Sequence, residues 1–107
     1  MPMTNDPGTL ERLRAEISAN GVVLFMNGTP SFPMCSPSAQ AVQILGMLGV
    51  NYKSVDVMAD PGLRPVLVSM SDWPTLPQLY VNGQFVGGAD IMREMFQSGE
   101  LHKLLGK

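Results

Sequence analysis

The sequence predicts an α/β fold in which helices flank a mixed four-stranded sheet, with one extra helix at the N-terminal end. Three observations lead to this prediction. Helical and strand patterns alternate along the 107 residues. The continuous apolar run Val22–Met26 is typical of a strand buried on both faces. An Asn82-Gly83 pair between alternating apolar residues marks a β-hairpin. A strand, its crossover helix and the next strand run parallel, whereas a hairpin adds an antiparallel pair, so the sheet is mixed.

The first half of the chain predicts two helices around that buried strand. Residues 9–20 follow helical spacing, and either Asp6 or Thr9 can serve as the N-cap. After a proline-rich loop, the apolar side chains of residues 38–48 again follow helical spacing. Gly49 then provides the C-terminal stop of this second helix, because glycine accepts the left-handed conformation there.

The second half of the chain predicts the remaining strands and helices. They are a strand over 52–57, a short helix over 61–70, the hairpin over 78–88, a helix over 91–97 and a last helical turn or two over 101–105. Asp60 is the expected N-cap of the short helix, with Pro61 at its first helical position. Asp90 is the expected N-cap of the helix after the hairpin.

Composition and charge exclude several classes of function. With 45% hydrophobic and 15% charged residues, the chain is expected to form one globular domain over residues 1–107. A net charge of −2 and the lack of a lysine or arginine run argue against a nucleic-acid partner. The longest apolar run is too short to span a membrane, and no secretory signal pattern begins the sequence. A single cysteine forms no internal disulfide, so we expect a cytoplasmic protein.

The position of that cysteine, Cys35, favours a reactive role for its thiol. It lies between prolines, after the buried strand and at the start of a predicted helix. Open α/β sheets bind ligands at this edge, where the strands have their carboxyl ends. A lone cysteine is more often a small buried apolar residue than a reactive one, and this position favours the reactive alternative. A helix N-terminus lowers the thiol pKa from about 8.5, and the largest effect brings it to about 7. At neutral pH the thiol is then about half ionised, whereas with the smallest effect it stays mostly protonated.

Three segments together resemble the monothiol glutaredoxins over nearly the whole chain. They are residues 26–57, 71–91 and 95–105, and the most specific pieces are Trp73-Pro74-Thr75-Leu76-Pro77 and Gly87-Gly88-Ala89-Asp90-Ile91. The resemblance implies a thioredoxin fold, with Cys35 as the active-site cysteine. It therefore makes Cys35 the catalytic residue and the metal ligand of this chain.

The resemblance also implies a glutathione site. Arg64 stands where the family binds the glycine carboxylate, and Leu76 stands where backbone groups pair with the peptide, before a cis bond to Pro77. Ala89 and Asp90 stand where a helix start binds the γ-glutamyl end. These residue types suit glutathione, because its two carboxylates and one ammonium group need a cation, backbone donors and a carboxylate.

Three positions depart from the family pattern. The usual Cys-Gly-Phe-Ser is here Cys35-Ser36-Pro37-Ser38, in which either serine can cap the helix, and a cysteine often found beside the aspartate is Ala89. The usual lysine, eight residues before the cysteine, is Asn27. That lysine supplies positive charge to the thiolate and to glutathione, so Asn27 is a predicted glutathione-binding position at which we expect weaker binding.

Three functions remain open at this point, and the sequence favours the first. In the first, two copies each contribute Cys35 and two glutathione molecules complete the ligands of a [2Fe-2S] cluster that bridges a homodimer. The resemblance implies apo iron–sulfur proteins as further partners of such a carrier, and BolA-type proteins as partners of a protein-binding face that an adaptor would keep. The second function is a glutathione-dependent monothiol oxidoreductase that removes glutathione from mixed disulfides. The third is a redox-inert adaptor with the same fold.

Overall fold

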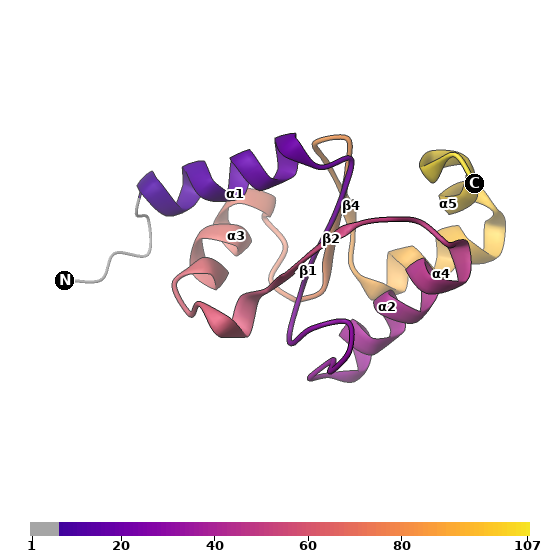
Figure 1. Ribbon diagram of the computed structural model, residues 1–107, viewed down its shortest axis with the longest axis horizontal. Helices are drawn as coiled ribbons and strands as arrows, with labels where there is room; N and C mark the ends of the chain where they lie inside the picture. The colour runs from indigo at the N-terminus through magenta and orange to yellow at the C-terminus, as the bar shows by residue number, and fades with distance from the viewer. Residues whose placement is uncertain (1–6) are drawn as a thin grey trace.

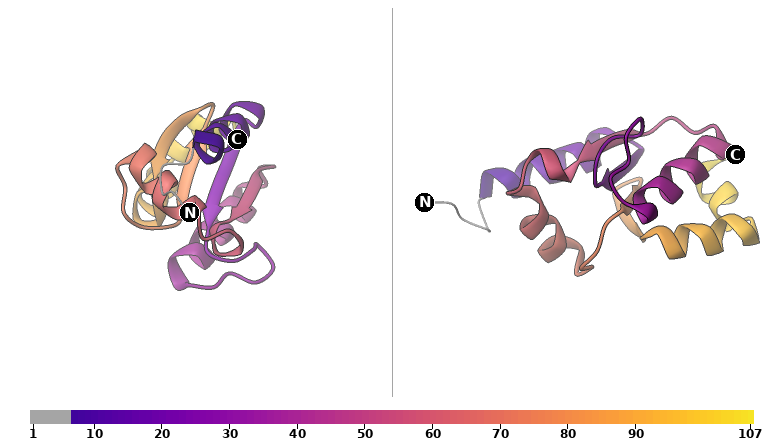
Figure 2. Two further views of the ribbon diagram at one scale, coloured as in Figure 1. Left: turned by 90° about the vertical axis from the view of Figure 1, so that its left-hand side faces the viewer. Right: turned by 90° about the horizontal axis from the view of Figure 1, so that it is seen from below.

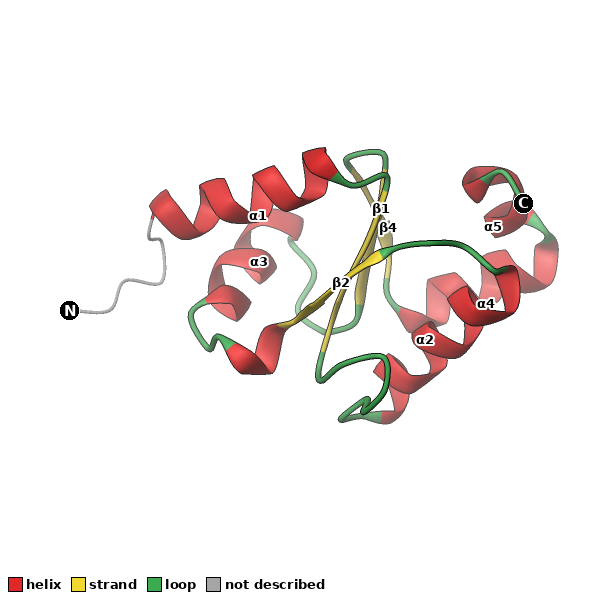
Figure 3. Ribbon diagram, viewed as in Figure 1, coloured by secondary structure: helices red, strands yellow, loops and turns green. Residues whose placement is uncertain are grey.

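The computed structural model describes residues 7–107 and contains the predicted mixed sheet. Its elements in chain order are α1 (Pro7–Ala19), β1 (Val22–Met26), α2 (Ser36–Leu48), β2 (Lys53–Asp56), the 3-10 turn η1 (Val57–Ala59), α3 (Leu63–Ser71), β3 (Gln78–Val81), β4 (Gln84–Gly87), α4 (Ala89–Ser98) and α5 (Glu100–Leu105). The strand order is β2-β1-β3-β4 (Figure 3). β1 pairs parallel with β2 and antiparallel with β3, and β3 pairs antiparallel with β4.

The sheet separates two groups of helices. Figure 1 shows α1 and α3 on one face and α2, α4 and α5 on the other, and the second view in Figure 2 shows the same division. A hydrophobic core lies on each face of the sheet. Successive side chains of β1 pack alternately into the two cores, because they point to opposite faces of the sheet. Val23 and Phe25 pack with α1 and α3, whereas Leu24 and Met26 pack with α2, α4 and α5. Each of these side chains is fully buried, which contributes about 1.5–3 kcal/mol apiece to folding.

The predicted hairpin turn is confirmed by its backbone. Asn82 has φ of 50° and Gly83 has φ of 84°, the two positive values that a type I′ turn requires. The N–H of Asn82 donates to the carbonyl of Gly21 at 2.7 Å, so the turn is also bound to the residue before β1. The two edge strands of the sheet, β2 and β4, have four residues each.

The structure corrects the helix starts in the first half of the chain. α1 begins at Pro7, so Thr9 is a buried residue of its first turn and not its N-cap; the alternative cap, Asp6, lies outside the described residues. α2 begins at Ser36 instead of residue 38, and its N-cap is Cys35, because Pro37 suits the first turn of a helix. Gly49 ends α2 in the left-handed conformation, as predicted.

Two aspartates predicted as N-caps do not cap their helices. Gly62 is the N-cap of α3, and the Asp60 carboxylate instead accepts a hydrogen bond from the Gly62 N–H at 3.2 Å in the preceding turn, which leaves Pro61 outside the helix. Gly88 is the N-cap of α4, and Asp90 lies one residue inside the first turn. The predicted strand over 52–57 also ends early, at Asp56, because that side chain accepts the Met58 N–H at 2.9 Å and starts η1.

Candidate thiol and glutathione site

The loop between β1 and α2 folds back on itself and brings Cys35 to the end of β1. The N–H of Met34 donates to the carbonyl of Asn27 at 2.9 Å, and Thr29 and Phe32 exchange backbone hydrogen bonds at 3.0 and 3.2 Å. Gly28 closes this loop with φ of +91°. A Cβ atom at Gly28 would lie 2.4 Å from the Phe32 carbonyl oxygen, so no other residue fits there without moving the backbone.

A single carboxylate ties this loop to the end of β2. Asp56 Oδ1 accepts the N–H of Gly28 at 2.9 Å and also the N–H of Met58 at 2.9 Å. The loop that carries the thiol is therefore anchored to two strands of the sheet, since Gly28 follows β1 and Asp56 ends β2.

The Cys35 thiol is surrounded by neutral polar groups. Its Sγ lies 3.2 Å from the Ser38 Oγ and 3.6 Å from the Asn27 Nδ2. Ser38 is fully buried, and its Oγ also accepts the backbone N–H of Asn27 at 3.1 Å. The Cys35 thiol donates to this Ser38 Oγ, and when the thiol is ionised the Ser38 hydroxyl can turn its own proton toward the sulfur.

These contacts set the direction of the Cys35 pKa. Partial burial raises it, but the hydroxyl and backbone N–H of Ser38 and the side-chain amide of Asn27 lower it, and the net result is a pKa below the ordinary thiol value. All three stabilising groups are neutral dipoles. Asn27 therefore stands where the sequence predicted it, beside the thiol, and acts there as a hydrogen-bond donor without charge.

The segment predicted to bind the glutathione backbone is firmly held. The Leu76-Pro77 peptide bond is cis, as the family resemblance implied. Gln78 is fully buried, and its Nε2 donates to the carbonyls of Trp73 at 3.0 Å and Thr75 at 3.4 Å. Residues 73–77 are thereby fastened to the first residue of β3.

Arg64 lies beside that segment. It is exposed on α3, and its Nη2 donates to the carbonyl of Pro74 at 3.3 Å. The structure therefore brings Arg64 and residues 74–77 to one place, as a shared glutathione groove requires. The hydrogen bond is exposed to solvent and single, so it holds the guanidinium loosely.

Ala89 and Asp90 open α4 next to the start of α2. Ala89 is buried, whereas the Asp90 side chain is 82% exposed and pairs with Arg93 at 3.3 Å. A hollow of about 470 Å³ joins the two helix starts, and it is lined by Ser36, Pro37, Ala39, Gln40, Gln43, Ala89 and Asp90. Arg64 and Leu76 do not line this hollow, so the predicted site residues form two groups, one beside Pro74 and one at the start of α4.

A close contact fixes how α4 begins. A Cβ atom at Gly88 would lie 3.1 Å from Trp73 Nε1 and 3.3 Å from the Pro77 carbonyl oxygen. The Trp73 indole therefore packs directly on the N-cap of α4 and links residues 73–77 to Ala89 and Asp90. Its Nε1 is buried and has no hydrogen-bond partner among the described residues.

Ser38 is the contact that sequence reasoning assigned differently. It was predicted only as a possible helix cap, but the structure gives it hydrogen bonds to both Asn27 and Cys35. Its spacing carried a usable signal, because a residue three positions after an N-cap points back toward that cap. This spacing predicts the contact only if Cys35 is the N-cap, and the structure establishes that it is.

One chain supplies one thiol ligand for iron. Within residues 7–107 no group of three or more histidine, cysteine or acidic side chains is arranged to hold a metal ion. Cys35 is a free cysteine, and the thiolate that its surroundings favour is the form that binds iron. The donor set therefore fits an iron–sulfur group only if other molecules provide the remaining sulfur ligands.

Comparison with known proteins identifies the family. The family model for glutaredoxin matches residues 22–86 of this chain. The chain belongs to the glutaredoxin family. It is 48% identical over 100 residues to an uncharacterized monothiol glutaredoxin of Synechocystis, with 94% of each chain covered. It is 44% identical over 97 residues to glutaredoxin 4 of Escherichia coli, with 91% of this chain and 84% of that one covered.

The fold agrees with solved glutaredoxin structures. The solution structure of reduced poplar apo GrxS14 matches with a TM-score of 0.84 and 41% identity, and the match covers 97% of this chain and 95% of that one. The predicted thioredoxin-type fold and the predicted monothiol glutaredoxin resemblance are both confirmed. No helix within residues 7–107 has the length and apolar character needed to cross a membrane.

Proposed function

We propose that this glutaredoxin carries a [2Fe-2S] cluster between two copies of the chain, each copy contributing Cys35 and one bound glutathione. The observation that supports it most is the single thiol, which is held at a helix start by neutral donors that favour its ionised form. Four sulfur ligands complete such a cluster, and one cysteine per chain leaves two of them to glutathione. Glutathione, BolA-type proteins and apo iron–sulfur proteins of the cytoplasm are the partners of this function.

The proposed glutathione site uses the groups on both sides of the thiol. Arg64 pairs with the glycine carboxylate, and the backbone of Leu76 pairs with the central cysteine residue of the peptide. The γ-glutamyl end lies at the start of α4, where the backbone N–H groups and the helix dipole favour its carboxylate. The exposed carboxylate of Asp90 then accepts the ammonium group.

The chain's own residues prepare Cys35 for a soft metal. Asn27 donates a hydrogen bond to the sulfur, and both Ser38 and Asn27 lower the Cys35 pKa, so less free energy is needed to remove its proton when iron binds. The sulfur is only partly buried, so a ligand held by a second copy can reach it.

A second function is favoured by the lowered Cys35 pKa. The Cys35 thiolate attacks the glutathione sulfur of a protein–glutathione mixed disulfide, a new disulfide forms between Cys35 and glutathione, and the client leaves as a thiolate. A second glutathione thiolate attacks the glutathione sulfur of that disulfide, which releases oxidised glutathione and restores the Cys35 thiolate. The second glutathione supplies both the resolving sulfur and the reducing electrons, so no second protein cysteine is needed.

Anaerobic reconstitution with iron, sulfide and glutathione distinguishes these functions. The carrier predicts visible absorption of a [2Fe-2S] cluster, glutathione in the product, and a dimer by size-exclusion chromatography. A colourless monomer that turns over a glutathionylated peptide would favour the oxidoreductase, and a colourless, inactive monomer would leave the adaptor. Cys35→Ser is the control for this reconstitution, because it removes the one thiol of the chain and should give neither a cluster nor turnover.

A further inference from the structure

Two hollows meet at one arginine on the face of the sheet that α1 and α3 cover. The first has a volume of about 400 Å³ and is lined by Arg14, Ile17, Ser18, Met70, Ser71, Tyr80, Gly83 and Phe85. The second has a volume of about 340 Å³ and is lined by Leu10, Arg14, Val66, Ser69 and Met70. Arg14 and Met70 belong to both, so we call the joined hollows the Arg14 site. Their sizes are in the range of small-ligand pockets.

Within residues 7–107, the exposed Arg14 side chain has no acidic partner. Neither lining contains an aspartate or a glutamate. The ion pairs of residues 7–107 join Arg12 to Asp60 and Arg93 to Asp90, and none of their side-chain hydrogen bonds involves Arg14. An unpaired guanidinium beside an apolar surface is matched by an anion that also carries an apolar group.

Aromatic rings form one wall of the site. Phe85 lies with its ring centroid 5.4 Å from that of Tyr80 and 5.7 Å from that of Trp73. Met70 lies on the floor between the hollows, and a thioether makes favourable contacts with aromatic rings. A planar ring on the ligand is therefore the apolar group that this wall suits best.

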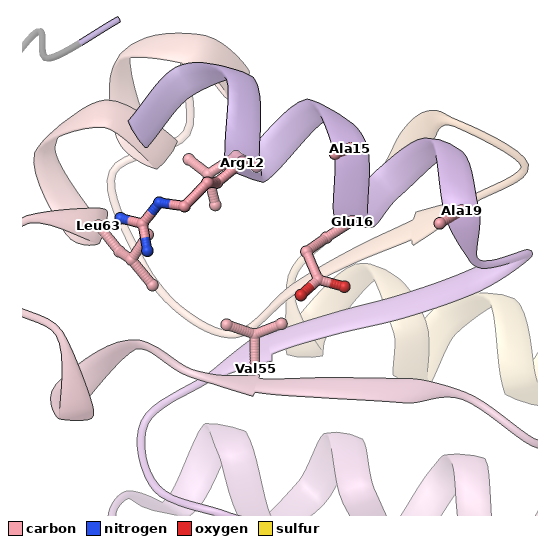
Figure 4. A pocket seen from close by; sticks show the side chains of 7 residues that line it. Arg12, Ala15, Glu16, Ala19, Val55 and Leu63 are labelled. Atoms are coloured by element: carbon pink, nitrogen blue, oxygen red, sulfur yellow. The ribbon is translucent and has the colours of Figure 1, made fainter. Parts of the chain in front are cut away.

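A neighbouring hollow on the same helix shows the opposite arrangement. Figure 4 shows Arg12 and Glu16 of α1 on either side of Val55, which points up from β2. Arg12 pairs with Asp60 at 3.3 Å, and Glu16 accepts a hydrogen bond from Asn20 at 3.4 Å. That hollow holds both signs of charge and its arginine is already paired, so it offers no unpaired cation to an anionic ligand.

We propose that the Arg14 site binds a small aromatic carboxylate, with the carboxylate on the Arg14 guanidinium and the ring against Phe85 and Met70. The site lies across the sheet from α2, whose start carries Cys35. Binding there is therefore separate from the proposed glutathione groove, and the proposal does not depend on the function of the thiol.

The test is a titration of the ¹⁵N-labelled protein with benzoate at constant ionic strength, followed by amide chemical shifts. We expect saturable shifts in α1 around Arg14 and in β4 at Phe85. Arg14→Gln should weaken binding about tenfold or more, because it removes a charge-assisted hydrogen bond. Arg14→Lys should retain part of the affinity, and benzamide, which has the ring without the charge, should bind about tenfold more weakly than benzoate.

Arg12→Gln is the matched control, because Arg12 is on the same helix and lines the neighbouring hollow. It should leave the benzoate affinity unchanged. The proposal is overturned if the shifts do not saturate, if they centre on Arg64 or Asp90, or if Arg14→Gln binds benzoate as the parent protein does. Equal losses in Arg12→Gln and Arg14→Gln would also overturn it, since net surface charge would then explain the binding.

Discussion

The two ends of the proposed site are built differently. At the thiol end, Ser38 is fully buried and hydrogen bonds link it to Asn27 and Cys35. At the peptide-binding end, Arg64 and Asp90 are exposed and each has a single contact of 3.3 Å. An exposed contact of this kind contributes less than about 1 kcal/mol. The thiol end is therefore organised before any ligand arrives, whereas in the proposed function the charged side chains would become ordered only on binding glutathione.

The largest expected effect is at the sulfur itself. Cys35→Ser should abolish both cluster assembly and glutathione transfer, because it removes the one thiol of the chain. The fold should persist, with a change in unfolding free energy of about 1 kcal/mol or less, since the side chain is only partly buried. Visible absorption and thermal unfolding measure the two quantities. A Cys35→Ser protein that assembled a cluster in equal yield would refute the ligand role.

Gly28→Ala tests whether the thiol end is rigid. The added Cβ meets the Phe32 carbonyl oxygen at 2.4 Å and φ is +91°, so we expect a loss of about 2–4 kcal/mol in unfolding free energy. Urea denaturation measures it, with Gly46→Ala as the control, because a Cβ at Gly46 meets nothing within 4 Å. Equal stability of the two variants would mean that the loop adapts and that the thiol end is not preorganised.

Ser38→Ala should raise the Cys35 pKa, because it removes the hydroxyl that stabilises the thiolate. A rise of about one pH unit is expected for a lost hydrogen bond to a charged group. The pH dependence of the Cys35 alkylation rate measures it, and Ser38→Thr should restore the parent curve. An unchanged curve in Ser38→Ala would exclude the hydroxyl as a determinant of thiol reactivity.

The same pKa has a consequence for stability against pH. The folded state lowers the Cys35 pKa, so the thiolate's contribution to stability is present above the pKa of the unfolded chain. It is lost as the pH falls through the folded-state pKa. Ser38→Ala should lower the free energy of unfolding at every pH, because the Asn27 N–H loses its acceptor. The difference from the parent protein should therefore grow further toward alkaline pH, where the thiolate also loses its stabilising hydroxyl.

Asn27→Lys replaces a neutral donor beside the thiol with a cation. Asn27 Nδ2 lies 3.6 Å from Cys35 Sγ, so a lysine at this position can place its ammonium group near both the thiolate and glutathione. The Cys35 pKa should fall further and glutathione should bind several-fold more tightly. Alkylation against pH and calorimetry measure these two changes. If neither changed, the lack of the family's lysine would have no effect here.

The smallest expected effect is at the peptide-binding end. Arg64→Gln should weaken glutathione binding a few-fold and leave the Cys35 pKa unchanged, because the guanidinium is solvated and, within residues 7–107, bonds only to the Pro74 carbonyl. Calorimetry at low and high salt measures it, and the difference should shrink as salt screens the charge. A shift in the thiol pKa on this substitution would show that the two ends are coupled.

Local patterns predicted the parts of the fold that local forces determine. The apolar run of β1 and the Asn82-Gly83 turn were placed correctly. Burial on both faces requires a continuous apolar run, and positive φ favours asparagine and glycine, so both can be recognised in the sequence. The predicted caps at Asp60 and Asp90 were wrong, because Asp60 accepts the Gly62 N–H in the turn before α3 and Asp90 lies inside α4, where it pairs with Arg93. Neighbouring glycines hold those cap positions.

The contacts of the candidate site depend on distant residues. Asn27 and Cys35 were predicted to lie close together from the family pattern, and their contact is present, but the burial of Ser38 depends on how α2 packs on the sheet. The Arg14 site was not predicted at all. It exists only where α1, α3 and the hairpin meet, and no short stretch of sequence contains that arrangement.

The short edges of the sheet limit how two copies of this protein can meet. β2 and β4 each offer four residues at an open edge, and β2 begins with the exposed, charged Lys53. Joining two sheets edge to edge would form few hydrogen bonds and would bury charge, so the sheet resists growth into continuous aggregates. The two most exposed large apolar side chains of the described residues lie on the loop beside the thiol, where Phe32 is 76% and Met34 is 61% exposed. The proposed pairing of two copies through Cys35 would take place beside these two side chains.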